Sequence, residues 1–516
     1  MKPMKQVLTT TILSLFLFSF NLGAQVYNPH DATEADILAN VESYVQQGLK
    51  MWKVPGTAVS IVKDGQLVYA KGFGVKDLSN PQEKVDEHTV FKIASVSKAF
   101  TPVVIAQLVD EGKVKWDTKV KDILPKFRMK DKFATDNMRV KDLFCHWSGL
   151  NGQSGSCIEC LGFDKEDLLK IIPVYEPGYS FRGDYQYNTM FYSISALVVE
   201  KISGKSWEQN IQERILDPLG MTETVLGGDG LMSAQNKAQS HSYEYLGGQI
   251  VVEPTPYEHQ PLHRLNEISA AGAIVSSVTD MSKWLQFQLD GGKVGDRQLV
   301  SKRQFAETHK GVNIEKQTED ALTLYGYGWH VEQSAKGRLY WHTGSGFGHT
   351  DICGFVPELK LGFMISSNSD GATGFRRALM RRIIDLYLGE PDNDYNFAEY
   401  ASFITNEEKK AEKAASKRQK VFEPSPEEAL LTGTYENKTL GKAVVSLEND
   451  RLFIVAGPKE WKHELVHTSG NAYKFESDGH IFPVTFKFNK KRDKIESLRI
   501  NVGVNSDDFG SWNKTK

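Results

Sequence analysis

The feature that most constrains this chain is residues 91–112, where a serine and a lysine precede an apolar run with helical spacing. Gly112 ends the run as glycine often ends a helix. Residues i and i+3 share a helix face, so we expect the amine of Lys98 beside the hydroxyl of Ser95. A free serine is a poor nucleophile, but a desolvated, uncharged amine can accept its proton. The N–H groups at a helix N-terminus would also stabilise an oxyanion formed at Ser95.

The spacing alone is weak, because a serine and a lysine stand three positions apart at two other places. Residues 60–63 lie in an alternating run typical of a strand, where positions three apart point to opposite faces. Residues 511–514 lie in a polar C-terminal tail without a helical pattern. Only Ser95 and Lys98 have the context that the chemistry needs. The alternative for this pair is a solvated serine and lysine that open an ordinary helix.

Two later motifs favour the catalytic interpretation. They follow in chain order as Tyr187-Asn188-Thr189 and His342-Thr343-Gly344. With the serine–lysine pair, they make the chain resemble the serine β-lactamase and penicillin-binding-protein superfamily, in its class C-related D-aminopeptidase and esterase branch. Accessory phrases typical of that family occur at residues 146–150, 218–221 and 271–276. The resemblance covers roughly residues 35–390, and the ordered set is more specific than any single motif.

The resemblance implies an acyl-enzyme site. Ser95 is the expected nucleophile and Lys98 its proton acceptor. Tyr187 would assist as a phenolate or a proton shuttle, with its pKa lowered by cationic neighbours such as Lys98. The backbone N–H groups of Ser95 and Ser345 would form the oxyanion hole, and His342 would complete the catalytic set. The positions that the resemblance assigns to substrate binding are Thr189, Thr343 and Gly344.

Two departures from the family pattern bear on the substrate. Thr189 stands where the family usually has asparagine, and a hydroxyl is shorter and less versatile than an amide. His342 replaces a lysine and offers a substrate carboxylate a weaker permanent charge. We expect His342 to be protonated below about pH 6.5, which would improve the binding of carboxylate-bearing substrates. Activated esters and D-aminoacyl amides should therefore be better substrates than cephalosporins.

These motifs leave three functions open. The first is a serine hydrolase acting through an acyl-enzyme on small amides or esters, with D-amino acid peptides, short esters and β-lactams as substrate classes. The second is a receptor-like protein that is acylated at Ser95, or binds a β-lactam or cell-wall peptide, without efficient turnover. The third is an inactive paralogue whose C-terminal domain does the binding. Persistence of a covalent adduct separates the second from the first.

The first 24 residues predict a secretory signal peptide. Lys2 and Lys5 precede the apolar run 12–20, and cleavage is expected after Ala24. The protein would then be soluble in the periplasm or secreted, without stable insertion in a membrane. Without the two lysines the formal net charge of −3 becomes −5, which does not indicate nucleic acid or an anionic membrane as partner. We expect a small-molecule or peptide substrate and no cofactor, and the sequence leaves the oligomeric state open.

The 516 residues are too many for one compact domain. Asp64-Gly65 joins two alternating runs and predicts a β-hairpin, while later strands are expected at 337–341, 351–356 and 361–366. Because the middle of the chain is mostly helical in pattern, we predict an α+β domain at 25–395. It would have an antiparallel sheet built from both ends of the domain, flanked by helices, and an inserted helical lobe. A charged linker at 396–425 and a small all-β, barrel-like domain at 426–516 would follow; the latter resembles a lipocalin-like domain.

Four cysteines and three late histidines raise the question of cross-links and metals. Cys157 and Cys160 lie in a Gly/Ser-rich loop, and a tight disulfide between them is one prediction. A redox motif or half of a zinc site is the alternative, less favoured because no second C-x-x-C accompanies it. The late histidines show no ligand spacing, so we expect surface residues and no metal site. These histidines are His463, His467 and His480.

Overall fold

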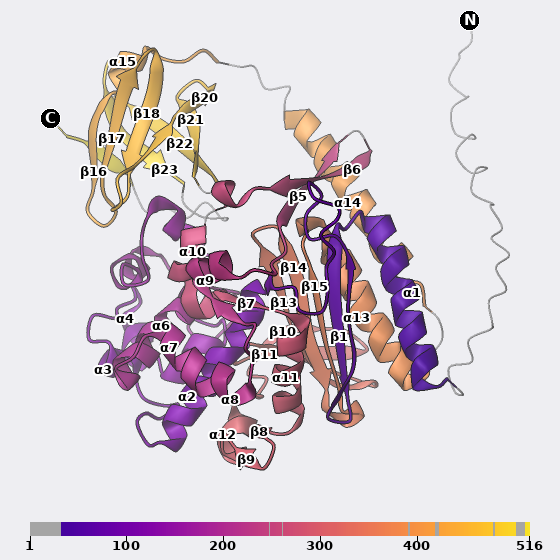
Figure 1. The fold of residues 1–516 in the computed structure, drawn as a ribbon. Helices are drawn as coiled ribbons and strands as arrows, with labels where there is room; N and C mark the ends of the chain where they lie inside the picture. Colours follow the sequence, from indigo (N-terminus) through magenta and orange to yellow (C-terminus); the bar gives the residue numbers. More distant parts are fainter. Residues whose placement is uncertain are drawn as a thin grey trace, which may run out of the picture.

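The computed structural model describes residues 32–246, 248–260, 262–390, 393–417, 423–477, 480–501 and 511–515. The expected signal peptide therefore lies outside the described residues. The first domain is built on an eight-stranded antiparallel sheet in the order β10-β11-β12-β13-β14-β15-β1-β2 (Figure 1). Its strands are β1 (Gly56–Lys63), β2 (Gln66–Gly74), β10 (Asn313–Gln317), β11 (Ala321–Gly326), β12 (Trp329–Ser334), β13 (Gly337–Gly346), β14 (His349–Val356) and β15 (Leu361–Ser367).

The N-terminal hairpin completes a sheet whose other strands come from much later in the chain. Asp64 and Gly65 have φ values of 50° and 78° and form the left-handed turn that an Asp-Gly pair favours. On its other edge β1 pairs with β15, with Val59 opposite Ile365. The prediction of one antiparallel sheet built from both ends of the domain is confirmed.

Alternation along β1 directs its side chains into two cores. Val59 and Ile61 pack against α1 (Glu34–Trp52) and α13 (Thr373–Leu388), which cover one face of the sheet. Ala58 faces the other core, which includes α11 (Val278–Leu289) and the helical lobe. Figure 1 shows α1, α13 and α14 along one side of the sheet and the lobe on the other.

The helical lobe is inserted between β2 and β10, as the sequence predicts. Its helices are α2 (Phe100–Asp110), α3 (Val120–Ile123), α4 (Lys132–Asn137), α5 (Leu168–Ile171), α6 (Met190–Ser203), α7 (Trp207–Ile211), α8 (Asp217–Leu219), α9 (Gly227–Ser233), α10 (Leu262–Ile268), α11 and α12 (Lys302–Glu307). Short strands accompany them: the sheet β3 (Phe91–Lys92), β7 (Ile274–Ser276) and β4 (Val225–Leu226), and the hairpins β5–β6 (Ser240–Leu246, Gln249–Thr255) and β8–β9 (Lys293–Val294, Arg297–Gln298). Strand β3 leads directly into the short helix that carries Ser95, and this helix packs against β13 of the large sheet. The lobe and the large sheet therefore meet at the predicted nucleophile.

The segment predicted as a charged linker begins as a packed helix. Helix α14 (Tyr395–Lys417) contacts α13 and α1. Tyr400 and Phe403 contribute to the packing, with ring centroids 5.2 Å and 5.4 Å from that of Trp52. These aromatic side chains attach the start of the segment to the first domain, although the residues that follow are mainly charged.

The C-terminal domain is a nine-stranded antiparallel sheet in the order β19-β18-β17-β16-β24-β23-β22-β21-β20. Near its start lies α15 (Glu428–Leu431), and its strands are β16 (Gly433–Asn437), β17 (Gly441–Glu448), β18 (Arg451–Ala456), β19 (Trp461–Glu464), β20 (Val466–Ser469), β21 (Ala472–Ser477), β22 (His480–Phe488), β23 (Ile495–Ile500) and β24 (Trp512–Lys514). Strand β19 contacts β21 across the seam, so the sheet is nearly closed. The predicted all-β, barrel-like fold is confirmed, and Figure 1 shows it seated over the helical lobe beside α10.

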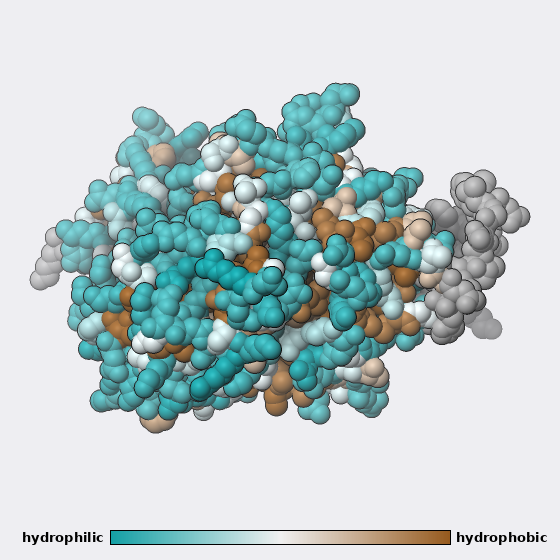
Figure 2. Space-filling model, turned by 60° about the horizontal axis from the view of Figure 1, so that its bottom comes forward, coloured by the Kyte–Doolittle hydropathy of each residue, from teal (hydrophilic) through white to brown (hydrophobic). Residues whose placement is uncertain are grey.

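Apolar side chains are mostly packed into these cores. Figure 2 shows a face that is largely hydrophilic, with hydrophobic residues gathered in small patches. Among the described helices, none is both long enough and apolar enough to cross a membrane.

Candidate active site

The turn that presents Ser95 differs from the α-helix expected there. Residues Ala94–Ala99 form a 3-10 helix, and α2 begins only at Phe100. In a 3-10 helix positions i and i+3 eclipse each other, so this geometry brings Ser95 and Lys98 together more directly than an α-helix would. Ala94 has a φ of 45°, a left-handed conformation that is strained for a residue with a Cβ. The strained turn sets the direction in which the serine projects.

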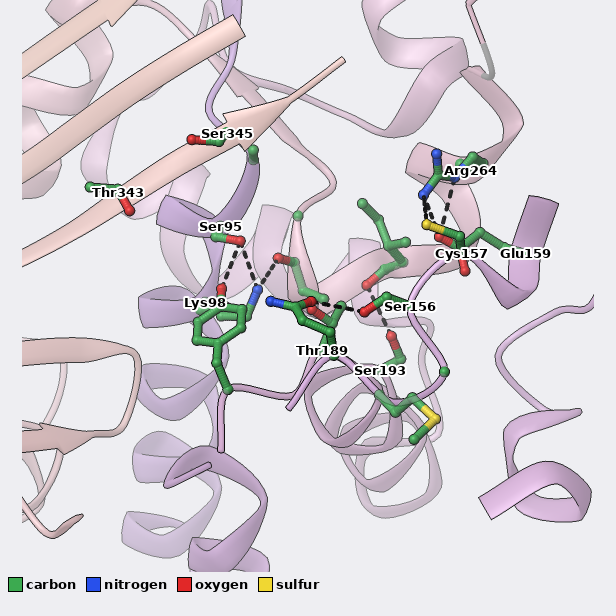
Figure 3. A pocket seen from close by; sticks show the side chains of 18 of the residues that line it. Ser95, Lys98, Ser156, Cys157, Glu159, Thr189, Ser193, Arg264, Thr343 and Ser345 are labelled. Atoms are coloured by element: carbon green, nitrogen blue, oxygen red, sulfur yellow. Dashed lines mark hydrogen bonds and ion pairs between the residues drawn. The ribbon is translucent and has the colours of Figure 1, made fainter. Parts of the chain in front are cut away.

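Lys98 is the buried partner of Ser95. Its Nζ lies 2.9 Å from Ser95 Oγ and 2.8 Å from the carbonyl oxygen of Ala271 (Figure 3). Burial lowers the pKa of Lys98 from 10.5 to about 7, because desolvation disfavours the charged amine. A neutral amine can donate to the Ala271 carbonyl and still accept the proton of the Ser95 hydroxyl.

Tyr187 is the second group on the serine, and its protonation state differs from the one expected. Its hydroxyl donates to Ser95 Oγ over 2.9 Å. Burial raises the pKa of Tyr187 above its ordinary value of 10, and the hydrogen bond with Ser95 offsets this only in part. The expected lowering of the pKa by Lys98, and with it the phenolate, is therefore wrong. Tyr187 is a neutral hydrogen-bond donor, and the imidazole of His146 lies against its ring with centroids 4.2 Å apart.

Strand β13 forms the wall opposite the serine. Its pairing with β12 ends at Trp341, so residues 342–346 present an unpaired edge to the Ser95 turn. Gly344 is required there, because a Cβ would overlap the carbonyl oxygen of Ile93. Buried Arg376 donates to the carbonyl oxygen of Gly344 and holds the strand end. Ser345 lines the same cavity as Ser95 (Figure 3), and its part in the oxyanion hole stays a prediction.

His342 cannot act as the titrating group that we expected from the sequence. It is 1% exposed, and its Nδ1 donates to the carbonyl oxygen of Thr343 over 2.7 Å. Its Nε2 accepts from the hydroxyl of Tyr325 over 3.1 Å. Burial, with the nearby charges of His330 and Lys98, holds the pKa of His342 well below 6.5. The predicted protonation near pH 6.5 is therefore wrong, and His342 is a neutral ring that supports the strand end.

The structure separates the two polar residues after Tyr187. Thr189 lines the cavity at the start of α6. Asn188 is buried beneath it: its side-chain oxygen accepts from the backbone N–H of Met190, and its amide donates to the carbonyl oxygen of Ser154. Asn188 therefore fixes the loop, while Thr189 faces the cavity. The binding roles of Thr189, Thr343 and Gly344 remain predictions, although all but Gly344 line the cavity.

Sequence reasoning missed an amide in the cavity wall. Gln153 lines the cavity, and its Oε1 accepts from the hydroxyl of Ser156 over 2.9 Å. With Oε1 held by Ser156, the NH2 group of Gln153 is available to donate to a substrate. The loop that carries it is rich in glycine and serine and shows no periodic pattern, so the sequence held no signal for this residue.

The cavity between the lobe and the sheet has a volume of about 560 Å³ and contains Ser95, Lys98, Tyr187 and His342 in its lining. Clefts of this size between lobes commonly bind small ligands. The other two serine–lysine pairs lie elsewhere: Ser60 is on β1, and Lys514 ends β24, which is a strand rather than the expected polar tail. The preference for Ser95 among the three pairs thus agrees with the geometry.

The expected disulfide is not formed, because all four cysteines are free thiols: Cys145, Cys157, Cys160 and Cys353. His480, expected at the surface, is half-buried against Cys157. The C-terminal domain thus places the side chain of His480 against the loop that borders the cavity.

The hydroxyl of Ser95 is hydrogen-bonded to a buried lysine and to a tyrosine, and it lies beside the edge of strand β13. Together with the fold, this arrangement defines a serine hydrolase of the β-lactamase and penicillin-binding-protein superfamily. The Beta-lactamase family model matches residues 41–388, so the chain belongs to that family. The resemblance found in the sequence is confirmed.

Similar proteins include hydrolases and penicillin-binding homologues. Unguisins hydrolase ungD' of Aspergillus campestris is 26% identical over 443 residues, which cover 81% of this chain and 79% of that protein. The octameric penicillin-binding protein homologue from Pyrococcus abyssi is 24% identical with a TM-score of 0.59, covering 90% of this chain and 98% of that one. The D-amino acid amidase from Ochrobactrum anthropi SV3 is 19% identical with a TM-score of 0.57, covering 69% and 98%. The two structural likenesses show the fold alone.

Proposed function

We propose that this protein is an exported serine hydrolase that cleaves small amides or esters through an acyl-enzyme on Ser95. The observation that carries the proposal is the placement of Lys98 Nζ and Tyr187 OH, each 2.9 Å from Ser95 Oγ. Neutral Lys98 takes the serine proton as Oγ attacks the substrate carbonyl. The backbone N–H groups of Ser95 and Ser345 hold the oxyanion.

Both half-reactions can use the same groups. When the tetrahedral intermediate collapses, the leaving amine or alkoxide needs a proton, which Lys98 returns directly or by way of the Tyr187 hydroxyl. Water then attacks the ester formed on Ser95, with neutral Lys98 as proton acceptor. The proton passes back to Oγ, and the free serine is restored as the acid leaves.

The charges of the cavity favour substrates without a carboxylate near the reacting bond. Lys98 is the base, and each other cation among the described lining residues is already engaged. Arg264 binds Glu159, Arg376 binds backbone carbonyls, Lys165 binds Glu200, and Arg377 binds Glu399. With His342 neutral, a β-lactam or D-Ala-D-Ala carboxylate has no free positive charge to meet.

Activated esters and D-aminoacyl amides are therefore the substrate classes that we propose. The Gln153 amide and the Thr189 hydroxyl can hydrogen-bond an uncharged acyl group. Glu315 in the cavity lining is paired with His330 through Oε2, and its second oxygen, Oε1, suits an α-ammonium group. Among the similar proteins, an unguisins hydrolase supports hydrolysis, and a D-amino acid amidase supports amides as a substrate class.

The test is a substrate panel on the mature chain. A short-chain aryl ester, the D- and L-alanyl anilides and a chromogenic cephalosporin are compared by kcat/KM, with intact mass recorded during turnover. Ser95→Ala should abolish turnover of all four, whereas Ser60→Ala, the matched serine of the β1 pair, should not. Turnover that survives Ser95→Ala refutes the mechanism. An adduct on Ser95 that forms once and persists would identify an acylated receptor, and a preference for the cephalosporin would overturn the substrate class.

A further inference from the structure

We propose that Cys157, Cys160 and His480 bind a zinc ion that joins the C-terminal domain to the loop bordering the Ser95 cavity. This metal site goes beyond the proposed hydrolysis and does not depend on it. One side-chain atom of each of the three residues lies within 4.8 Å of the others. Within the described part of the chain these three residues form the group able to hold a metal.

The distance between sulfur and imidazole is close to that across a tetrahedral zinc ion. Cys157 Sγ lies 3.5 Å from Nδ1 and 3.4 Å from Nε2 of His480. Zinc bonds of about 2.3 Å to sulfur and about 2.0–2.1 Å to nitrogen, at a tetrahedral angle, place the two ligand atoms roughly 3.6 Å apart. The sulfur lies at about that separation from the imidazole. Because it is nearly equally far from both ring nitrogens, it lies beside the ring rather than in line with one nitrogen lone pair, so the His480 ring must turn to bind a shared zinc ion.

Two separate parts of the fold deliver these ligands. Cys157 caps the 3-10 helix Ile158–Leu161 with a φ of 71°, and Cys160 lies within that helix, so both sulfurs can face one point. His480 is the first residue of β22 and pairs with Ser477, the last residue of β21. The hydroxyl of Ser477 donates to the carbonyl oxygen of Cys160 over 2.7 Å. This bond holds the end of the two strands against the cysteine helix.

The surroundings suit a pair of thiolates on a dication. Cys157 is 8% exposed and Cys160 is 0% exposed, and soft sulfur ligands with one imidazole favour zinc over calcium or magnesium. Arg264 places Nη2 3.6 Å from Cys157 Sγ and 2.8 Å from Glu159 Oε1 (Figure 3). Two thiolates neutralise the ion and Glu159 neutralises Arg264, so the buried group has no net charge.

The site would act on the hydrolase through the cavity wall. Cys157 and Glu159 both line the cavity that contains Ser95, so fixing Cys157 to His480 fixes part of the substrate wall to the C-terminal domain. Three protein ligands leave a fourth position for a water molecule. A disulfide between Cys157 and Cys160 is the competing arrangement, and it would leave His480 without a role.

The deciding measurement is metal content of the full chain, purified without a histidine tag and with its thiols kept reduced. We expect one zinc per chain by elemental mass spectrometry. Replacement by Co²⁺ should give the intense visible bands of tetrahedral cobalt and a thiolate-to-cobalt charge-transfer band. Cys157→Ser, Cys160→Ser and His480→Ala should each lower zinc to background. Cys353→Ala and His467→Ala, matched changes away from the site, should leave it unchanged.

The wild-type chain also decides the question if a variant fails to fold. Chelation should remove the zinc and speed proteolysis between the two domains, and added Zn²⁺ should reverse this. A reduced wild-type chain without stoichiometric zinc overturns the proposal, as does full zinc content in folded His480→Ala. A zinc-free native chain about 2 Da lighter than its reduced form would show the disulfide instead.

Discussion

Lys98 offers the sharpest test of the proposed chemistry, because its function depends on losing its charge. The neutral fraction of an amine at pH 7 is roughly 3 in 10,000 when the pKa is 10.5 and about one half when the pKa is about 7. Burial therefore raises the concentration of the base form by about 10³-fold. The rise of kcat/KM with pH should follow this deprotonation, with a midpoint near 7.

Two substitutions separate the charge of Lys98 from its proton-accepting role. Lys98→Arg keeps a positive charge at every pH used, because a guanidinium does not deprotonate below about pH 12. Lys98→Met removes both the charge and the base. Each should slow acylation by about 10²–10⁴-fold, the usual contribution of a positioned proton acceptor. In each variant the rise of kcat/KM with pH near pH 7 should disappear.

The assay is kcat/KM for an aryl ester from pH 5.5 to 9, with acylation followed by intact mass. Thermal unfolding of the same proteins gives a readout independent of activity. Folded Lys98 binds fewer protons than the unfolded chain between about pH 7 and 10.5, so its contribution to stability rises with pH in that window. Lys98→Met should therefore raise Tm most below pH 7. Lys98→Arg with activity within tenfold of wild type, or a flat wild-type profile, would refute the reasoning.

Three further predictions follow from the same geometry. Tyr187→Phe removes the 2.9 Å hydrogen bond to Ser95 and should lower kcat by about 10²-fold or more. Because burial raises the pKa of Tyr187, ionisation of this residue should not change wild-type activity between pH 8 and 9. A change of activity in that pH range that Tyr187→Phe abolishes would contradict this expectation. His342→Gln should leave the pH dependence of kcat/KM unchanged between pH 5.5 and 7.5, since the pKa of His342 lies well below 6.5. If the wild-type profile has an inflection near pH 6.5 and this variant abolishes it, the protonation expected from the sequence would be correct after all. Gly344→Ala should lower both Tm and kcat/KM, because the added Cβ would overlap the carbonyl oxygen of Ile93. If both values stay at those of the wild type, the strand end can move away from the serine.

Local patterns in the sequence were sufficient to predict the sheet and the pairing of Ser95 with Lys98. The Asp64-Gly65 pair needs only its own backbone preference to form the hairpin. Ser95 and Lys98 need only a helical turn of either type to meet, since three residues make one turn of a 3-10 helix and nearly one turn of an α-helix. Even the wrong helix type therefore led to the right pair.

The protonation states could not be predicted in this way, because they depend on what covers a side chain. Lys98 was expected to lower the pKa of Tyr187, but the amine is buried too and has lost about half of its charge at pH 7. An amine without a charge gives a phenolate no Coulombic stabilisation, and the hydrogen bond with Ser95 offsets the effect of burial only in part. His342 is closed in by Tyr325, a residue of the separate strand β11, and no motif at residues 342–344 reports that contact.

The proposed zinc ligands show where sequence reasoning must stop. Cys157-Ile158-Glu159-Cys160 has the same spacing in a disulfide, a redox site and half of a zinc site. The residue that distinguishes them is His480, which is 323 positions from Cys157. Its place depends on how the C-terminal domain seats, and that is decided by contacts with no motif of their own. Lys459 pairs with Glu267, and the ring of Trp461 lies 4.9 Å from that of His263. If the domain were turned away, His480 would be an ordinary surface histidine, as the sequence suggests. The proposed metal ion would therefore need ligands from both domains, and neither domain alone would bind it.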